Sequence, residues 1–500
     1  MYYRSTRGAN EKIKSSTAIV RGIAPDGGLY VPEKMPQIDR DFKKFSELDY
    51  RDIALYITGK FFTDFTDDEL KNCIRNAYDK KFDDPAITPL VEKGGVFFLE
   101  LFHGPTLAFK DIALSLLPHL LKSAVAKTGI NKEIVILTAT SGDTGKAALE
   151  GFKNVEGTRI IVFFPKGGVS KVQEMDMTTQ EGNNTYVVAV KGNFDDTQRG
   201  VKEIFSDRDF NNALSRKGFL FSSANSINIG RLIPQIVYYF YSYFTLIRTG
   251  KIKPDEPVNI VVPTGNFGNI LAAYYSKRMG LPVRTLICAS NENNVLYDFI
   301  RTGTYDRRRK LILTSSPAMD ILVSSNLERL LYEISGSNSS LINELMNDLN
   351  KKGLFKITDR MRSRMEDFYG EFATDKETAE TIKYVFSNFN YLIDTHTAVG
   401  YNVYQKYLKE TGDTTKTIIA STASPFKFPG SVASALDEKY AGMDEFELMG
   451  VLSEISGLKI PEPMKNLAKK EVIHTTVCEP GQMKNVISDI LNLQEKKEKD

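Results

Sequence analysis

Several short segments of this chain are apolar at nearly every position, and helical segments separate them. An uninterrupted apolar strand needs protein on both faces, which is the situation of a strand inside a parallel sheet. Strands and helices that alternate in this way are typical of α/β proteins. The sequence therefore predicts an α/β fold with parallel sheets in two lobes, and strands at 95–99, 133–140, 159–164, 185–190, 258–263, 284–289 and 416–421.

The N-terminal region lacks this alternation. A turn-rich segment at 24–32 precedes helical patterns at about 46–60 and 67–80. These patterns predict an N-terminal helical cap domain over residues 1–90, without a sheet of its own.

Residues 91–500 form the predicted main region. We expect a smaller lobe over about 128–250, and a larger lobe over about 91–127 plus 251–500. The polar segment KIKPDEP (251–257) is the candidate for a crossing between the lobes. A helix is predicted at 110–127, with a kink or a break at Pro118 and an end at Gly129.

Composition and charge exclude several classes of protein. A chain of 500 residues is longer than one core usually holds, and its net charge of +2 argues against a nucleic acid partner or a membrane surface. Cys73, Cys288 and Cys478 are too widely spaced for a metal pattern or a disulfide set, which fits a cytoplasmic protein. The histidines also lack metal spacing, so no metal site is expected. The most apolar stretch, 232–247, is interrupted by Pro234 and predicts a buried helix.

Lys110 is the second-last residue of the motif ELFHGPTLAFKD (100–111) and stands at the start of the predicted helix. Phe109 and Ile112 flank it, so its amine should be partly desolvated and its pKa lowered. Such an amine can form a Schiff base with an aldehyde. Most lysines on helices are simply solvated, but the apolar context favours a buried one here.

A glycine-rich turn, GNFGN (265–269), follows the strand at 258–263 and precedes a helix. Two glycines let the backbone approach an anion, and the amides of the following helix can bind it. The turn has neither the Walker spacing nor the dinucleotide-binding spacing, and a glycine turn by itself is often only a turn. A phosphate cradle together with a separate lysine is what pyridoxal phosphate requires.

Three further polar segments stand at the ends of predicted strands or the starts of helices. SGDTGK (141–146) could hold a carboxylate or simply cap a helix. STASP (421–425) could offer a hydroxyl to a pyridine nitrogen or form a turn. NSINIGR (225–231) could bind an anionic leaving group or cap a helix beside a surface arginine.

These segments together resemble the threonine synthases, which are fold-type II pyridoxal phosphate enzymes with a tryptophan synthase β-like fold. The resemblance runs in the family's order through YRSTRG (3–8), DGGLYVP (26–32), the Lys110 motif, TATSGDTGKAA (138–148), SSANSINIGRL (222–232), VVPTGNFGN (261–269) and STASPFKF (421–428). The SGDTG motif and the chain length are similar to the longer bacterial and fungal branch.

The resemblance implies a role for each of several residues. Lys110 is expected to form the Schiff base and to move protons, and Thr422 to face the pyridine nitrogen. The expected ligands of the cofactor phosphate are Gly265, Asn266, Phe267, Gly268 and Asn269. Residues expected near the substrate carboxylate and the phenolic oxygen of the cofactor are Ser141, Asp143 and Thr144. The expected ligands of the substrate phosphate are Asn225, Ser226 and Arg231.

The implied reaction converts O-phospho-L-homoserine and water into L-threonine and phosphate, the last step of threonine biosynthesis, in a monomer or a homodimer. A threonine or serine dehydratase and a phospho-lyase that makes no threonine are the alternative enzymes. A dehydratase needs no site for a second phosphate, which argues against it. A third alternative is a non-catalytic binding protein, but the motif around Lys110 would then have no function.

Overall fold

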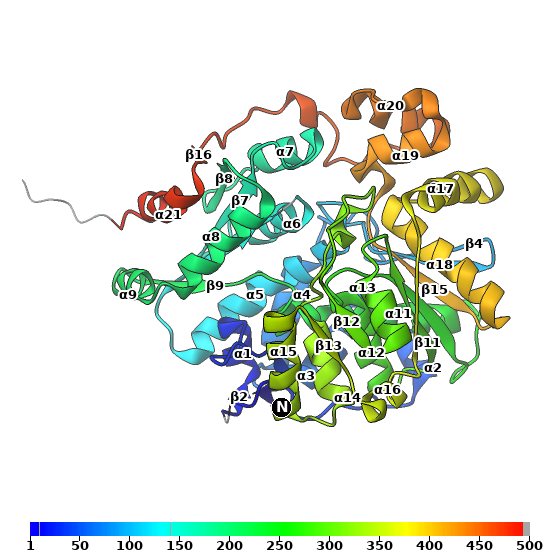
Figure 1. Ribbon diagram of the computed structural model, residues 1–500, viewed down its shortest axis with the longest axis horizontal. Helices are drawn as coiled ribbons and strands as arrows, with labels where there is room; N and C mark the ends of the chain where they lie inside the picture. The colour runs from blue at the N-terminus through cyan, green and yellow to red at the C-terminus, as the bar shows by residue number, and fades with distance from the viewer. Residues whose placement is uncertain (10, 141, 494–500) are drawn as a thin grey trace, which may run out of the picture.

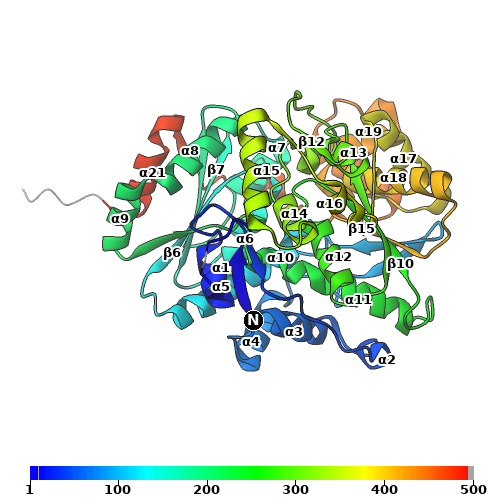
Figure 2. The same ribbon diagram turned by 60° about the horizontal axis from the view of Figure 1, so that its bottom comes forward.

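The computed structural model describes residues 1–9, 11–140 and 142–493 (Figure 1). The predicted substrate ligand Ser141 lies outside the described residues. Two sheets built largely from parallel strands lie side by side, and the N-terminal region runs along the lower edge of both (Figures 1 and 2). The two-lobed α/β arrangement of parallel sheets expected from the apolar segments is therefore present.

The larger sheet has six strands in the order β14-β11-β10-β15-β5-β4. All neighbours are parallel except the edge pair β4 and β5, which are antiparallel. In chain order its strands are β4 (Leu90–Lys93), β5 (Val96–Glu100), β10 (Val258–Pro263), β11 (Val283–Ser290), β14 (Phe368–Phe372) and β15 (Thr417–Ser421). The strands predicted in this part of the chain are confirmed, whereas β4 and β14 were not predicted.

The smaller sheet has five parallel strands in the order β16-β8-β7-β6-β9. Its strands are β6 (Glu133–Ala139), β7 (Thr158–Pro165), β8 (Thr185–Val190), β9 (Phe219–Ser222) and β16 (Val477–Cys478). The strand β16 comes from the C-terminal end of the chain, where α21 (Met483–Ile490) packs against α8 (Phe194–Ser206). The C-terminal end therefore completes the smaller sheet, although the sequence pattern assigns it to the larger lobe.

Helix α5 (Lys110–Thr128) is one continuous helix despite Pro118. The predicted break at Pro118 is therefore absent, and the helix ends at Gly129 in the left-handed conformation, as expected. The other helices of the smaller lobe are α6 (Asp143–Phe152), α7 (Lys171–Thr178) and α9 (Arg208–Arg216). Those around the larger sheet are α11 (Pro234–Arg248), α12 (Gly268–Arg278), α13 (Val295–Thr302), α14 (Leu327–Ile334), α15 (Ser339–Lys352), α16 (Asp359–Ser363), α17 (Asp375–Phe389), α18 (Thr395–Thr411), α19 (Pro429–Leu436) and α20 (Glu445–Ser456).

The N-terminal region contains a sheet that was not expected. Strands β1 (Tyr2–Ser5), β2 (Ile13–Lys14) and β3 (Tyr30–Pro32) form a three-stranded antiparallel sheet. The predicted helices follow it as α3 (Tyr50–Phe61) and α4 (Asp67–Ala77). A helical cap without a sheet is thus wrong for the first part of the region, because strands this short leave too few positions for an alternating pattern. One hydrophobic core runs from Tyr3 through both sheets, so the region is packed into the main body.

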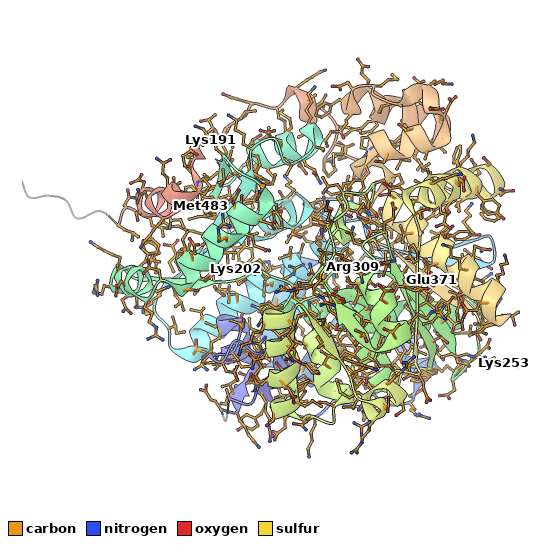
Figure 3. The ribbon with its side chains drawn as sticks, in the orientation of Figure 1. Lys191, Lys202, Lys253, Arg309, Glu371 and Met483 are labelled. Atoms are coloured by element: carbon orange, nitrogen blue, oxygen red, sulfur yellow. The ribbon has the colours of Figure 1, made fainter. Side chains whose placement is uncertain are left out.

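The chain passes from the smaller sheet to the larger one between Ser222, the end of β9, and Pro234, the start of α11. Helix α11 packs against α3 and α12, and nearly all of it is buried, which confirms the predicted buried helix. The polar segment 251–257 therefore follows the crossing, and Lys253 on it projects from the surface (Figure 3). Polarity identified this loop correctly but did not reveal which elements it joins. Among the described residues, no helix has the length and apolar character to cross a membrane.

Candidate active site

Lys110 is the first residue of α5, and only 12% of its side chain is exposed. Its Nζ atom lies 3.5 Å from Oδ2 of Asp143, at the start of α6. Burial lowers the pKa of Lys110; the Asp143 carboxylate raises it, and the charges of Lys427 and Arg231 lower it again. The net direction is downward, which favours the free amine that a nucleophile or a base requires.

Backbone hydrogen bonds join the loop before Lys110 to the residues that follow β15. The backbone N–H of Phe109 donates to the carbonyl oxygen of Thr422 at 2.9 Å, and Ser424 N–H donates to the carbonyl oxygen of Leu107 at 3.0 Å. Leu107 has a φ of +59°, a conformation that costs energy in a residue with a branched side chain. These contacts bring the predicted cofactor ligand Thr422 next to the start of α5.

Asp143 lies between two lysines and an amide. Its Oδ1 atom accepts a hydrogen bond from Gln173 Nε2 at 3.2 Å and lies 3.4 Å from Nζ of Lys427. Burial alone would raise the pKa of Asp143, but the charges of Lys427 and Lys110 hold it well below its usual range. Asp143 is therefore an ionised carboxylate that is shared by both lysines.

The turn that leads into α6 is capped by Thr140. Its hydroxyl oxygen accepts from the N–H groups of Gly142 at 3.0 Å and of Gly145 at 2.9 Å. Gly142 has a φ of +138°, and a Cβ atom there would lie 2.5 Å from Gln173. Thr144 follows in the first turn of α6 and is half-buried. Thr140 therefore takes the capping role that the sequence suggested for the segment 141–146, and Asp143 is free to contact Lys110.

The glycine turn, GNFGN (265–269), leads from β10 into the first residues of α12. Its carbonyl groups are held from outside: Ser324 donates to Gly265, and both the backbone N–H and Nδ2 of Asn326 donate to Asn266 at 3.1 Å. Phe267 has a φ of +64°, and a Cβ atom at Gly265 would lie 2.8 Å from the carbonyl oxygen of Ala318. With its carbonyls engaged, the turn presents the free amides of the α12 N-terminus, which suit an anion.

Asn269 in the first turn of α12 is almost fully buried. Its Oδ1 atom accepts from the hydroxyls of Tyr238, at 2.7 Å, and of Tyr239. Its buried Nδ2 atom has no hydrogen-bond partner among the residues that the structure describes. A buried donor without an acceptor is costly unless a ligand supplies one. This geometry fits a phosphate at the glycine turn.

Arg231 in α10 (Ile229–Leu232) is only 4% exposed. Its Nη1 atom donates to the carbonyl oxygen of Ala224 at 2.8 Å, whereas its buried Nε has no partner within the described part of the chain. Burial lowers the pKa of Arg231 to about 10. No carboxylate forms an ion pair with Arg231 within the described ranges, so an anionic ligand would find an unneutralised charge here.

Ser226 is connected to the glycine turn through Asn326, whose Nδ2 atom donates to the Ser226 hydroxyl at 3.3 Å as well as to Asn266. Asn326 therefore bridges the segment predicted to bind the substrate phosphate and the turn predicted to bind the cofactor phosphate. Asn225 is exposed, and within the described part of the chain no hydrogen bond links its side chain to this group.

Comparisons with known proteins identify the family of this chain. The family model described as threonine synthase N terminus matches residues 2–78, the model for pyridoxal-phosphate dependent enzymes matches 84–422, and the threonine synthase C-terminal model matches 397–487. The chain is 38% identical to the threonine synthase of Saccharomyces cerevisiae, with 87% of this chain and 89% of that protein aligned. The chain belongs to the threonine synthase family.

Other relatives place it in the same family. The threonine synthase of Pseudomonas aeruginosa is 38% identical over 87% of this chain and 90% of its own length. The crystal structure of a pyridoxal phosphate-bound threonine synthase from Brucella melitensis superposes with a TM-score of 0.87 at 36% identity, covering 98% of both chains. Threonine synthase-like 1 of Homo sapiens is 39% identical over 85% of this chain, which spans 58% of that longer protein.

The family, the fold type, the enzyme class and the pyridoxal phosphate cofactor predicted from the sequence are confirmed by these comparisons. The roles of individual site residues and the domain boundaries stay predictions. Sequence reasoning missed Gln173, Lys427 and Asn326, which the fold brings to the site. Lys427 stands inside the quoted motif STASPFKF and could have been noticed there, whereas Gln173 and Asn326 carry no local signal.

Proposed function

We propose that this protein makes L-threonine and phosphate from O-phospho-L-homoserine and water, with pyridoxal phosphate held by Lys110 and the glycine turn. The observation that carries the proposal is the buried amine of Lys110, 3.5 Å from the Asp143 carboxylate, in a protein of the threonine synthase family. We further propose a cytoplasmic location, which the three free, buried cysteines support, and a monomer or a homodimer.

The cofactor would be held at both of its ends. The residues proposed for its phosphate are Gly265, Asn266, Phe267, Gly268 and Asn269, and the unpaired Nδ2 of Asn269 supports this assignment. We propose that the Thr422 hydroxyl contacts the pyridine nitrogen, because the carbonyl oxygen of Thr422 accepts a hydrogen bond from Phe109, the residue before Lys110. When bound, pyridoxal phosphate delocalises the negative charge that remains after a proton leaves the substrate carbon.

Lys110 would bind the aldehyde carbon of the cofactor and move protons on the substrate. As a free amine, Nζ can take the proton from the Cα atom of the substrate; once protonated, it can return a proton at a later step. Its lowered pKa supports both uses at neutral pH. Asp143 directs the amine and stabilises its protonated form through the contact at 3.5 Å.

Arg231 would bind the phosphate of the substrate, together with the hydroxyl of Ser226 and the amide of Asn225. The support is the buried guanidinium, which contacts one carbonyl oxygen and retains an unpaired Nε. The charge of Arg231 also lowers the pKa of Lys110, so the two cationic groups act on each other electrostatically.

Asp143 is better suited to a lysine than to the substrate carboxylate. An ionised carboxylate repels a second one, and the charges of both lysines keep Asp143 ionised. We therefore propose the half-buried Thr144, and Ser141 beyond the described residues, for the substrate carboxylate. Asp143 would then act on Lys110 and on the side of the cofactor that carries the phenolic oxygen.

Two alternatives on the same scaffold differ in substrate or product. A threonine or serine dehydratase has no use for a second buried anion site, so the unneutralised Arg231 favours a substrate with a phosphate. A phospho-lyase would use the same substrate and release phosphate without threonine.

Product analysis of the holoenzyme with O-phospho-L-homoserine separates the three functions. Threonine and phosphate in equal amounts are the expected result. Phosphate released together with a 2-oxo acid and ammonia would identify a phospho-lyase. In a parallel assay with L-threonine as the substrate, its consumption, together with unchanged O-phospho-L-homoserine in the first assay, would identify a dehydratase and contradict the proposal.

A further inference from the structure

A second lysine, Lys427, is buried next to Lys110. It ends the short helix η2 (Pro425–Lys427), which follows β15, and is only 4% exposed. Its Nζ atom donates to the carbonyl oxygen of Thr106 at 2.9 Å and lies 3.4 Å from Oδ1 of Asp143. Thr106 belongs to the loop that leads to Lys110, so Lys427 contacts both the carboxylate and the loop that position the reactive amine.

The two lysines share one carboxylate. Lys110 approaches Oδ2 of Asp143 at 3.5 Å, and Lys427 approaches Oδ1 at 3.4 Å. With both amines protonated, this buried group carries more positive than negative charge, which low-polarity surroundings disfavour. Deprotonation of one lysine is therefore favoured. Which of the two loses its proton depends on the other charged groups near each amine.

The surroundings favour a charged Lys427. Burial alone would lower the pKa of Lys427, but Asp143, Asp176 and Asp111 raise it above its ordinary value. Among the groups of the described residues that act most strongly on Lys110, Asp143 alone raises its pKa, and the net shift is downward. The charged groups that act on Lys110 come from three elements: Asp143 on α6, Lys427 on η2 and Arg231 on α10.

We propose that Lys427 is a positioning residue, a permanent cation that occupies one oxygen of Asp143 and thereby leaves Lys110 with a free amine. The inference rests on the proposed role of Lys110, yet it concerns only groups of the chain itself. Gln173 shares Oδ1 of Asp143 with Lys427, which leaves Oδ2 turned to Lys110. Lys427 therefore fixes the orientation of the Asp143 carboxylate and keeps that carboxylate ionised.

The test measures the ionisation of Lys110 in the full-length protein after removal of the cofactor. An amine-reactive label is applied across a pH series, and the modified peptide that contains Lys110 is quantified by mass spectrometry. The variants are Lys427→Met, which removes the charge at similar length, and Lys427→Arg, which retains it. The matched control is Lys439→Met, which removes an exposed lysine paired with Asp437.

Lys427→Met should reduce the fraction of free amine at Lys110 by about tenfold at neutral pH, because Asp143 is then available to Lys110 alone. Lys427→Arg should restore most of it, and Lys439→Met should change nothing. Unaltered labelling of Lys110 in a folded Lys427→Met protein would overturn the proposal. So would an equal loss in Lys427→Arg, since packing and not charge would then be the cause.

The measurement stays decisive if Lys427→Met does not fold. A wild-type Lys110 that labels at an ordinary lysine pKa, or above it, contradicts the proposal without any variant. The result is also separate from the proposed reaction. A protein that makes no threonine but shows the expected labelling retains the inference about Lys427 and loses only the function.

Discussion

Two groups of buried cationic side chains lie in or near the proposed active site, and they differ in whether a carboxylate contacts them. In the lysine cluster (Lys110, Lys427 and Asp143), a carboxylate lies within 3.5 Å of both amines. In the arginine region (Arg231 and Arg329), the guanidinium groups donate to carbonyl and amide oxygens. Burial lowers the pKa of both arginines to about 10.

The two arginines differ from each other in the use of their donors. Arg329 is fully buried and donates to Tyr30 from the N-terminal region, to Ile227 and to Asn326. Arg231 has one carbonyl partner and a buried Nε without any within the described residues. A buried cation whose donors are occupied is part of the scaffold, whereas one with an unused donor is ready for a ligand. In the lysine cluster each amine already has a carboxylate partner, whereas Arg231 retains a donor that a substrate could use.

Lys110→Ala should have the largest effect, because it removes the group proposed to bind the cofactor and to move protons. We expect turnover of O-phospho-L-homoserine to fall by at least about a thousandfold. Circular dichroism and the urea midpoint should stay close to wild type, since alanine is a good helix former at the start of α5. The matched control is Lys122→Ala on the same helix, whose exposed amine pairs with Glu156. Substantial turnover by Lys110→Ala would contradict the proposed function.

Arg231→Ala should affect the substrate and spare the cofactor. Loss of a charge-assisted contact to the substrate phosphate should raise KM by about a hundredfold or more, on the order of 3 kcal/mol. Cofactor affinity, measured by titration of the apoprotein, should change by less than about threefold. Inorganic phosphate should raise the urea midpoint of the wild type by binding at Arg231, and this stabilisation should disappear in the variant. Equal losses of substrate and cofactor affinity would place Arg231 outside the substrate phosphate site.

The lysine cluster and the arginine region were predictable from the sequence to different degrees. Lys110 and the glycine turn could be recognised because each stands at a junction between a strand or loop and a helix, where local pattern and chemistry coincide. The strands with a continuous apolar run were predictable for a similar reason, since such a run is typical of a strand with both faces covered, whereas β4, β9, β14 and β16 were missed. Arg231 could be proposed, although nothing local shows that it is buried.

The remaining residues escaped prediction because their contacts join distant parts of the chain. Asn326 connects Ser226 to Asn266, and Arg329 connects Tyr30 to Ile227. No local periodicity encodes such a bond. The same reason accounts for the crossing between the sheets, which depends on where α11 packs and not on the polarity of the loop after it.

Arg329→Met tests whether the arginine region is partly scaffold. The substitution leaves the oxygens of Tyr30, Ile227 and Asn326 without their buried donor, so we expect a loss of stability of about 2 kcal/mol. The urea midpoint measures it, with Arg360→Met on the exposed face of α16 as the control. Unlike Arg231→Ala, this variant should weaken substrate and cofactor binding together, since Asn326 touches both proposed phosphate sites. A stable variant with normal binding would remove Arg329 from the scaffold.

Substitution of His103 should have the smallest effect on stability. It tests a cationic side chain that has a carboxylate at each ring nitrogen. Its Nδ1 lies 2.6 Å from Asp83 and its Nε2 lies 2.9 Å from Glu100, in the loop that precedes Lys110. Burial opposes the charge, but both carboxylates raise the pKa of His103 to about 9, above the ordinary value of 6.5. Because the folded pKa is the higher one, this contribution to stability is complete below about pH 6.5 and is lost as the pH rises through about 9.

His103→Gln should therefore destabilise the protein by about 1–2 kcal/mol at pH 6 and by much less at pH 10. Urea midpoints of wild type and variant, compared at the same pH, cancel the titration of other groups. Reactivity of Lys110 towards the amine label should stay unchanged at pH 7, because the charge of His103 is neutralised by its own two carboxylates. A difference in stability that does not vary between pH 6 and pH 10 would mean that His103 acts through packing, and that its charge adds nothing to the loop.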